Sequence, residues 1–146
     1  MIHLQQDFKE FLKSLSDNSV EYLLVGGYAV GYYGYIRATA DLDIWVNQSD
    51  SNSKKLVKAL REFGFGENIN IEMFLKDNNI VRMGVPPFRI EIMTSISGVS
   101  FDVCYRNRNQ IDCDGQQIDV ICLDDLKKNK KASGRFKDLS DLEYLP

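Results

Sequence analysis

Two adjacent glycines, Gly26 and Gly27, separate a short apolar run from a segment that can form a helix. The run at 20–25 is rich in residues that favour strands, and 28–33 can continue as a helix before the next glycine. Glycines at such a junction allow backbone N–H groups to approach a phosphate without interference from side chains. A Gly-Gly pair alone also occurs as a simple turn. The sequence therefore predicts a strand, a glycine turn and a helix.

This turn belongs to neither of two common phosphate-binding loops. The chain contains no G-x-x-x-x-G-K-[ST] motif and no G-x-G-x-x-G motif. A P-loop ATPase and a dinucleotide-binding dehydrogenase are therefore disfavoured.

Two carboxylates stand two positions apart in the segment Asp41-Leu42-Asp43-Ile44, which begins a second predicted strand at 42–46. Alternate residues of a strand project to the same face, so both acids can bind one metal ion while Leu42 and Ile44 enter the core. An exposed strand edge or a loop would also explain an isolated D-x-D pair. The glycine turn that precedes the pair favours the interpretation as a metal site, because it would place a phosphate site next to the two acids.

A third carboxylate, Glu91, lies in the apolar strand-like segment at 89–93. Ile90 and Ile92 share one face of this strand, and Glu91 lies on the other. If this strand lies beside 41–43, three acids point to one place. A cross-strand salt bridge from Glu91 to a lysine or an arginine is the alternative.

The rest of the chain alternates between further helices and strands. Apolar periodicity and turn residues predict helices at 4–15, 49–63, 123–131 and 135–145, and strands at 80–85, 88–93, 111–113 and 117–121. The prolines at 86–87 require a bend or a sheet edge, the Asp-Gly pair at 114–115 suits a tight hairpin turn, and 66–77 is ambiguous. This order predicts an α+β (α/β) fold, a mixed central sheet flanked by helices, in one domain spanning 1–146.

The composition favours a soluble, cytoplasmic protein without a membrane partner. Of its 146 residues, 44% are hydrophobic and 27% are charged, and no apolar run is long enough to span a bilayer. The first 13 residues mix charged and apolar side chains, which is not the pattern of a signal peptide.

Composition also limits the chemistry. The only histidine is His3, so a Ser-His or Cys-His pair is disfavoured, and the three cysteines form no C-x-x-C pair, which favours buried free thiols. Any chemistry must use carboxylates, metal ions and basic residues. The net charge of -3 gives no general attraction to nucleic acid, although a local basic run comprises Lys127, Lys128, Lys130, Lys131, Arg135 and Lys137.

These segments together resemble a known signature. The stretch Gly26-Gly27-Tyr28-Ala29-Val30, followed by the segment G-Y-I-R-A-T-A-D-L-D-I at 34–44, resembles that of the DNA polymerase beta-type nucleotidyltransferase superfamily, and Glu91 fits its third carboxylate. Segments 97–101 and 131–142 resemble small bacterial members related to AbiEii-type toxins. Many active members have a serine after the two glycines, where this chain has Tyr28, and their third acid is often aspartate.

The resemblance implies transfer of a nucleoside monophosphate from a nucleoside triphosphate to an acceptor hydroxyl, with pyrophosphate leaving. Two Mg²⁺ ions would be held by Asp41, Asp43 and Glu91, and Glu91 could also accept the proton of the acceptor. The implied nucleotide-binding residues are Gly26, Gly27, Tyr28, Arg37, Lys131, Arg135 and Lys137.

Some of these nucleotide-binding residues have a structural alternative. Arg37 could form a salt bridge to a nearby acid, and the basic run could be a solvated helix face. Asp138 and Asp141 stand at helical spacing from Arg135 and Lys137, respectively, so ion pairs could use part of that charge. The tyrosines at 28, 32, 33 and 35 could stack on a base or pack between helices.

The sequence leaves three classes of acceptor open: a small molecule such as an aminoglycoside or lincosamide antibiotic, a transfer RNA end, and a protein hydroxyl. A homodimer or a partner protein could complete the pocket. The alternatives to the enzyme are a catalytically weak nucleotide-binding or protein-interaction module, such as a toxin-antitoxin component, and a structural domain with an incidental acidic edge.

Overall fold

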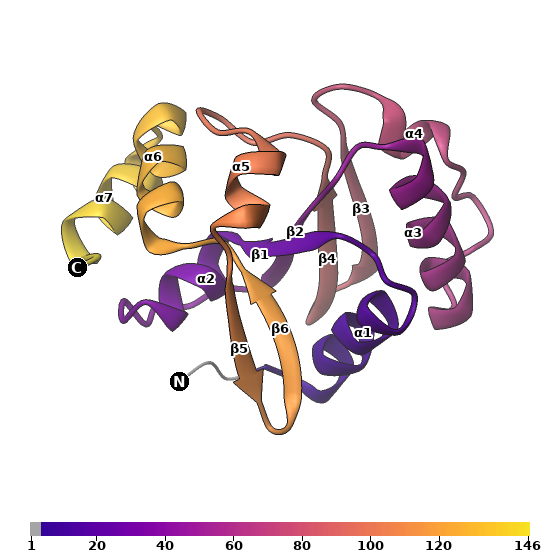
Figure 1. Ribbon diagram of the computed structural model, residues 1–146. Helices are drawn as coiled ribbons and strands as arrows, with labels where there is room; N and C mark the ends of the chain where they lie inside the picture. The colour runs from indigo at the N-terminus through magenta and orange to yellow at the C-terminus, as the bar shows by residue number, and fades with distance from the viewer. Residues whose placement is uncertain (1–3) are drawn as a thin grey trace.

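The computed structural model describes residues 4–146, so His3 and the expectation that rests on it lie outside the described residues. The described chain forms a six-stranded sheet in the order β3-β4-β2-β1-β6-β5 (Figure 1). The strands are β1 (Tyr22–Val25), β2 (Asp41–Val46), β3 (Ile80–Val85), β4 (Phe88–Met93), β5 (Asn109–Cys113) and β6 (Gln116–Val120). The helices are α1 (Gln6–Asp17), α2 (Gly26–Tyr32), α3 (Asp50–Phe63), α4 (Glu72–Leu75), α5 (Phe101–Arg106), α6 (Leu123–Ser133) and α7 (Phe136–Tyr144).

The sheet is mixed, which confirms the predicted fold class. β2 runs parallel to β4 and antiparallel to β1, and β1 runs parallel to β6. The outer pairs β3-β4 and β5-β6 are antiparallel hairpins. Because β2 and β4 are neighbours, the two predicted acidic segments lie side by side.

Helices pack on both faces of the central strands. Phe88 lies on the face of β4 that carries Ile90, and its ring is 5.1 Å from Phe8 of α1 and 6.1 Å from Phe63 of α3. On the opposite face, Trp45 of β2 packs edge-on against Phe101 of α5, with ring centroids 5.1 Å apart. The acids of β2 lie on this second face, beyond the area that α5 covers.

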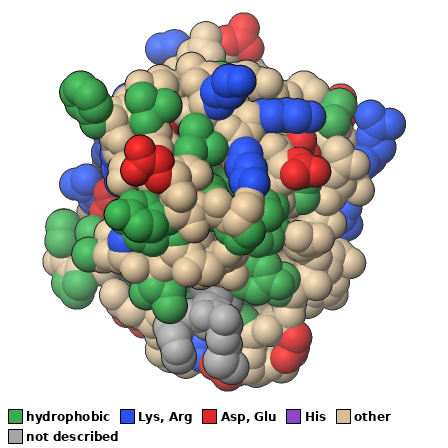
Figure 2. Space-filling view, turned by 90° about the vertical axis from the view of Figure 1, so that its left-hand side faces the viewer, with side chains coloured by type: hydrophobic (Ala, Val, Ile, Leu, Met, Phe, Trp, Pro, Cys, Tyr) green, Lys and Arg blue, Asp and Glu red, His purple; other side chains and the backbone are tan. Residues whose placement is uncertain are grey.

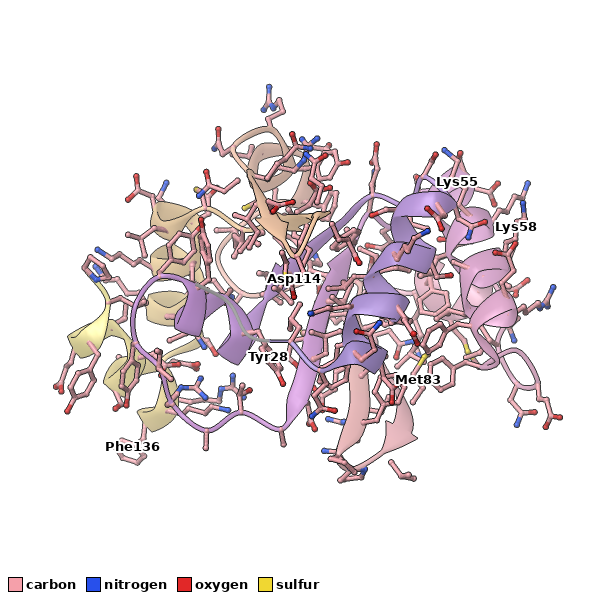
Figure 3. All side chains as sticks on the ribbon, turned by 90° about the horizontal axis from the view of Figure 1, so that it is seen from below. Tyr28, Lys55, Lys58, Met83, Asp114 and Phe136 are labelled. Atoms are coloured by element: carbon pink, nitrogen blue, oxygen red, sulfur yellow. The ribbon has the colours of Figure 1, made fainter. Side chains whose placement is uncertain are left out.

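Several local predictions are confirmed at the residues that motivated them. Ser49 caps α3 by accepting a hydrogen bond from the Asn52 N–H at 3.1 Å, and α3 ends before Gly64. The proline pair at 86–87 forms the turn between β3 and β4 at the sheet edge. Asp114, labelled in Figure 3, lies at the turn of the β5-β6 hairpin and forms an ion pair with Lys9 of α1.

Two short helices were not predicted. The helix α5 is only six residues long, and although Phe101, Cys104 and Tyr105 have helical spacing, this segment is too short for the pattern alone to predict a helix. Tertiary contacts hold it in place, since Phe101 packs on Trp45 and Cys104 is fully buried. The ambiguous segment at 66–77 contains α4, whose Phe74 is buried in the core. In both places a buried side chain accounts for a helix that the local pattern left unmarked.

Among residues 4–146, no helix is both long and apolar enough to cross a membrane.

Candidate active site

A cleft of about 530 Å³ opens on the acidic face of the sheet. Its floor comprises Asp41 and Asp43 of β2 and Glu91 of β4. The glycine turn and the loop at 37–40 form one side, and residues of α6 and α7 form another. Three regions of the chain that are distant in sequence therefore meet at the predicted acids. Figure 2 views the molecule from the side of α6 and α7, where basic, acidic and hydrophobic side chains are interspersed.

The three predicted acids share one face, as the strand periodicity requires. Leu42 and Ile44 are fully buried on the other face of β2. The parallel register of β2 and β4 places Asp43 directly beside Glu91 and Asp41 beside Arg89. The sequence predicted that the three acids converge if the two strands are neighbours, and the fold meets this condition by placing Glu91 beside Asp43.

The Asp43 carboxylate is the most unusual of the three acids. Burial, together with the negative charges of Glu91 and Asp41, raises its pKa from 3.8 to about 6. Within residues 4–146, no hydrogen bond or ion pair reaches this carboxylate. A buried acid beside two like charges is stabilised by a cation, so the donor set suits a hard metal ion such as Mg²⁺.

Arginines pair with the other two acids. Arg89 donates to Asp41 from Nη2 at 3.1 Å and from Nε at 3.3 Å, and Arg82 donates to Glu91 from Nε at 2.9 Å. In this arrangement no group of three acids, histidines or cysteines among the described residues is set to hold a metal ion. The alternative reading of Glu91, a cross-strand salt bridge to an arginine, therefore holds in this state. Metal binding at all three acids requires these pairs to open.

The glycine turn fits closely against the acids. Gly26 has a φ of 68°, a left-handed conformation that favours glycine, and a methyl group there would overlap the carboxylate of Asp43. A methyl group on Gly27 would overlap the Thr39 hydroxyl. Both glycines are needed so that the backbone can approach these side chains, and both line the cleft.

Arg37 lines the cleft, and it also forms a salt bridge to an acid, which the sequence allowed as the alternative to nucleotide binding. Its Nε and Nη2 donate to the two carboxylate oxygens of Asp141 at 2.7 and 2.9 Å. Asp141 is only 1% exposed and also pairs with Lys130 at 3.1 Å. Burial alone would raise the pKa of the Asp141 carboxyl, but the hydrogen bonds from Arg37 and Lys130 lower it below its usual range.

A second buried acid, Asp138, completes a charged network between α6 and α7. It pairs with Lys130 at 3.3 Å and with Arg135 at 2.8 Å. Burial would raise the pKa of its carboxyl, but hydrogen bonds from Arg135 and Ser133 and the charge of Lys130 lower it far below its usual range. The predicted pair between Arg135 and Asp138 is confirmed.

Lys137 lines the cleft, and within the described chain no ion pair involves it. Its predicted pair with Asp141 is wrong, because Asp141 faces Arg37 and Lys130 instead. Lys137 is near enough to Asp43 to oppose the rise in the pKa of that carboxyl. This cation is therefore available to an anionic ligand.

Two predicted nucleotide-binding residues, Tyr28 and Lys131, do not line the cleft. Tyr28, labelled in Figure 3, packs edge-on against Phe8 of α1 with ring centroids 5.7 Å apart. Lys131 is exposed, and the neighbouring Lys130 faces the cleft instead. The other tyrosines also pack on one another or on α7, with Tyr35 stacked on Tyr144 at 4.4 Å.

Reasoning from sequence missed several polar residues of the cleft. Thr39, Arg82, Lys130 and Asn129 line it, and Arg89 pairs with two of its acids, Asp41 at 3.1 Å and Glu91 at 4.0 Å. The position of Arg89, two residues before Glu91 on a strand, could have placed it on the acidic face. Lys130 carried no such signal, since only the docking of α7 on α6 decides which lysine of the run is buried.

Comparisons with known proteins identify the fold. No family model and no curated protein matches the chain. The crystal structure of a candidate nucleotidyltransferase from Thermotoga maritima matches with a TM-score of 0.65 and 14% identity, over 93% of this chain and 88% of that one. An antigenic nucleotidyltransferase-like protein from Paracoccidioides brasiliensis matches with a TM-score of 0.56 and 14% identity, over 99% of this chain and 77% of that one. The chain therefore has the fold of the nucleotidyltransferases.

Proposed function

We propose that this protein is a Mg²⁺-dependent nucleotidyltransferase, which transfers a nucleoside monophosphate from a nucleoside triphosphate to an acceptor hydroxyl. The observation that carries the proposal is the buried Asp43 carboxylate, which has no ion-pair partner among residues 4–146 and lies beside Asp41 and Glu91 on the floor of the cleft. Carboxylates in this setting serve as ligands of hard cations. The shared fold of two transferase-named neighbours supports the same activity.

The acids would hold the metal ions. Asp41 and Asp43 would bind one Mg²⁺ with the triphosphate, and the same residues with Glu91 would bind the second. Bound Mg²⁺ supplies positive charge that neutralises the phosphates and lowers the pKa of the acceptor hydroxyl. The pairs of Arg89 with Asp41 and of Arg82 with Glu91 are close enough to the surface to exchange for other ligands, since the arginine side chains are 39% and 58% exposed.

The chain itself would orient the donor and remove the acceptor proton. The glycine turn admits phosphate oxygens close to the backbone, and Arg37 and Lys137 offer positive charge from the facing wall. The acceptor oxygen would form a bond to the α-phosphorus while the bond breaks between that phosphorus and the oxygen that bridges the α- and β-phosphates. Pyrophosphate would leave, and the proton of the acceptor hydroxyl would pass to Glu91.

A labelling experiment tests the activity. The protein would be incubated in a cell extract with Mg²⁺ and each nucleoside triphosphate, labelled in parallel at the α- or the γ-phosphate. Wild type is expected to transfer the α-label alone, and Asp43→Asn is expected to transfer none. Asp17→Asn provides a matched control, because Asp17 is exposed at the end of α1 and, within the part of the chain that the structure describes, forms an ion pair with Lys13 alone. Transfer of the γ-label, or equal labelling by Asp43→Asn, would contradict the proposal.

The labelled product identifies the acceptor class. Nuclease digestion, protease digestion and filtration of small molecules separate the three acceptors that the sequence left open. The proposed relation to AbiEii-type toxins stays a prediction, and the names of the two structural neighbours do not favour the alternative of an interaction module.

A further inference from the structure

Two arginines lie on the acidic face of the sheet, on the side away from the glycine turn. Strand pairing places Arg82 of β3 opposite Glu91 of β4, and Arg89 precedes Glu91 by two residues on the same face. The sheet order β3-β4-β2-β1 puts the glycine turn, which follows β1, beyond the acids of β2 (Figure 1). Since neighbouring strands are about 4.8 Å apart, β4 and β3 stand about 10 and 14 Å from β1. The acids therefore separate the two arginines from the glycine turn.

The structure pairs both arginines with acids of the proposed metal site. Within residues 4–146, Arg82 forms an ion pair with Glu91 alone, and Arg89 forms ion pairs with Asp41 and Glu91 alone. The arginine side chains are 58% and 39% exposed, so these pairs are partly solvated and contribute little to stability. Binding of metal ions at the acids would occupy the carboxylate oxygens that the arginines now contact. Two guanidinium groups would then be free to bind another anion.

The direction of the proposed reaction places the acceptor beside these arginines. In phosphoryl transfer the attacking and leaving oxygens are roughly in line on opposite sides of the phosphorus. Because the leaving pyrophosphate lies toward the glycine turn in the proposed reaction, the acceptor oxygen approaches from the side of β4 and β3. Glu91, the proposed recipient of the acceptor proton, stands on that side, between Asp43 and Arg82. The two arginines therefore border the acceptor.

We propose that Arg82 and Arg89, once metal binding has released them from the acids, hold a phosphate group of the acceptor close to its reacting hydroxyl. Guanidinium groups match phosphate oxygens in planar, paired hydrogen bonds, and one phosphate has enough oxygens for two arginines. The inference rests on the proposed function, because it names the acceptor class of that same reaction. A nucleic-acid end and a phosphorylated small molecule share this chemistry, whereas an aminoglycoside, which is a polycation, would be repelled.

Binding of small probes in Mg²⁺ tests this acceptor site without turnover. The probes are the dinucleotide uridylyl-uridine and glycerol phosphate, each compared with its phosphate-free counterpart, uridine or glycerol, by ligand-observed NMR. Arg82→Gln and Arg89→Gln are each expected to weaken binding of the phosphate-bearing probes about tenfold, as the loss of a hydrogen bond to a charged group does, and to leave the counterparts unchanged. Arg106→Gln at the end of α5 controls for the loss of one positive charge. Tighter binding of one phosphate-bearing probe tells a nucleic-acid end from a small molecule.

Two further variants separate this acceptor site from the donor side and from a structural role. Arg82→Lys keeps the charge and is expected to keep most of the binding. Lys137→Gln, on the facing wall of the cleft, is expected to have a smaller effect than either arginine variant. Equal binding by wild type and both arginine variants, with all of them folded by circular dichroism, would overturn the proposal. Absence of binding of both phosphate-bearing probes by folded wild type would overturn it as well.

The exchange of partners predicts a dependence on metal. In EDTA the arginines stay with the acids, so the phosphate-bearing probes should bind more weakly to wild type, and Arg82→Gln should have little further effect. By linkage, the dinucleotide should strengthen Mg²⁺ binding more in wild type than in Arg82→Gln. An effect of Arg82→Gln on probe binding that is equal in Mg²⁺ and in EDTA would overturn the exchange.

The outcomes for this acceptor site and for the enzyme are separable. Arginine-dependent binding of a phosphate-bearing probe, without any transfer of the α-label, would support the site and contradict the proposed reaction. Transfer of the α-label to an acceptor without a phosphate, equally by wild type and Arg82→Gln, would support the enzyme and overturn the site.

Discussion

Asp43 and Glu91 lie directly beside each other on the neighbouring parallel strands β2 and β4. Neither strand contains both charges, so the repulsion between them arises only when the sheet assembles. Burial and this repulsion raise the pKa of Asp43 to about 6. The same relationship that suits a metal site therefore has a cost in stability while the metal is absent.

Asp43→Asn is expected to stabilise the metal-free protein near neutral pH. Because the folded pKa of about 6 exceeds the reference value of 3.8, ionisation of Asp43 disfavours the folded state. The stability that the protonated form contributes is fully present below about pH 4 and is lost as the pH rises through about 6. The variant should therefore be more stable than wild type by about 2–3 kcal/mol above this window and nearly equal to it below. Urea unfolding in EDTA across this range measures the difference, with Asp17→Asn as control. A difference that does not change with pH would contradict the prediction.

Arg89→Gln is expected to strengthen metal binding. Arg89 donates two hydrogen bonds to Asp41, and this pair competes with a cation for the carboxylate. Because a partly exposed salt bridge contributes at most about 1 kcal/mol, the gain in Mn²⁺ affinity should be about fivefold. Calorimetry with Mn²⁺ measures the affinity, and Arg106→Gln at the end of α5 is the matched control. Unchanged or weaker Mn²⁺ binding by Arg89→Gln would show that the arginine does not compete.

Loss of Asp138 is expected to destabilise the protein. Asp138 is fully buried between Lys130 and Arg135, and Asp138→Asn leaves Lys130 with one acid instead of two. Removal of one partner from a buried ion pair costs about 3 kcal/mol. Lys137→Gln, by contrast, removes an exposed cation without an ion pair among the described residues and should change the free energy of unfolding by less than about 0.5 kcal/mol. Urea denaturation of both variants gives the comparison, and similar values for the two would contradict it.

Two glycines of α2 are expected to respond in opposite ways to alanine. Gly26→Ala places a methyl group against the Asp43 carboxylate at a positive φ, and it should cost about 1–3 kcal/mol and impair metal binding. A methyl group on Gly31 would meet no atom within 4 Å other than those of its chain neighbours and the backbone of its own helix, so Gly31→Ala should stabilise α2 by up to about 1 kcal/mol. Thermal unfolding of the two variants measures both effects. Equal changes for the two glycines would show that the close approach at Gly26 is unimportant.

Local sequence predicted most of the elements, because caps, turns and periodicity act within a few residues. Ser49 and Gly64 mark the ends of α3, and the prolines at 86–87 mark the turn of a hairpin. The helix α5 was not predicted, because the contacts that hold it are not local: Phe101 packs on Trp45 of a distant strand, and Cys104 is buried in the core. The basic run shows the same limit, because the ion pairs of Lys130 depend on how α7 docks.

The sequence by itself determined that Asp41 and Asp43 share a face and that Glu91 opposes Ile90 and Ile92, because alternation along a strand is a property of the backbone. Only the tertiary structure decided that β4 lies beside β2 in the register that pairs Asp43 with Glu91. It also decided that Thr39 and Arg37 meet at Gly27, which the spacing of these residues along the chain does not specify. The physical reason is that strand pairing and helix docking depend on contacts between distant segments, whereas the direction of a side chain on a strand depends on its neighbours alone.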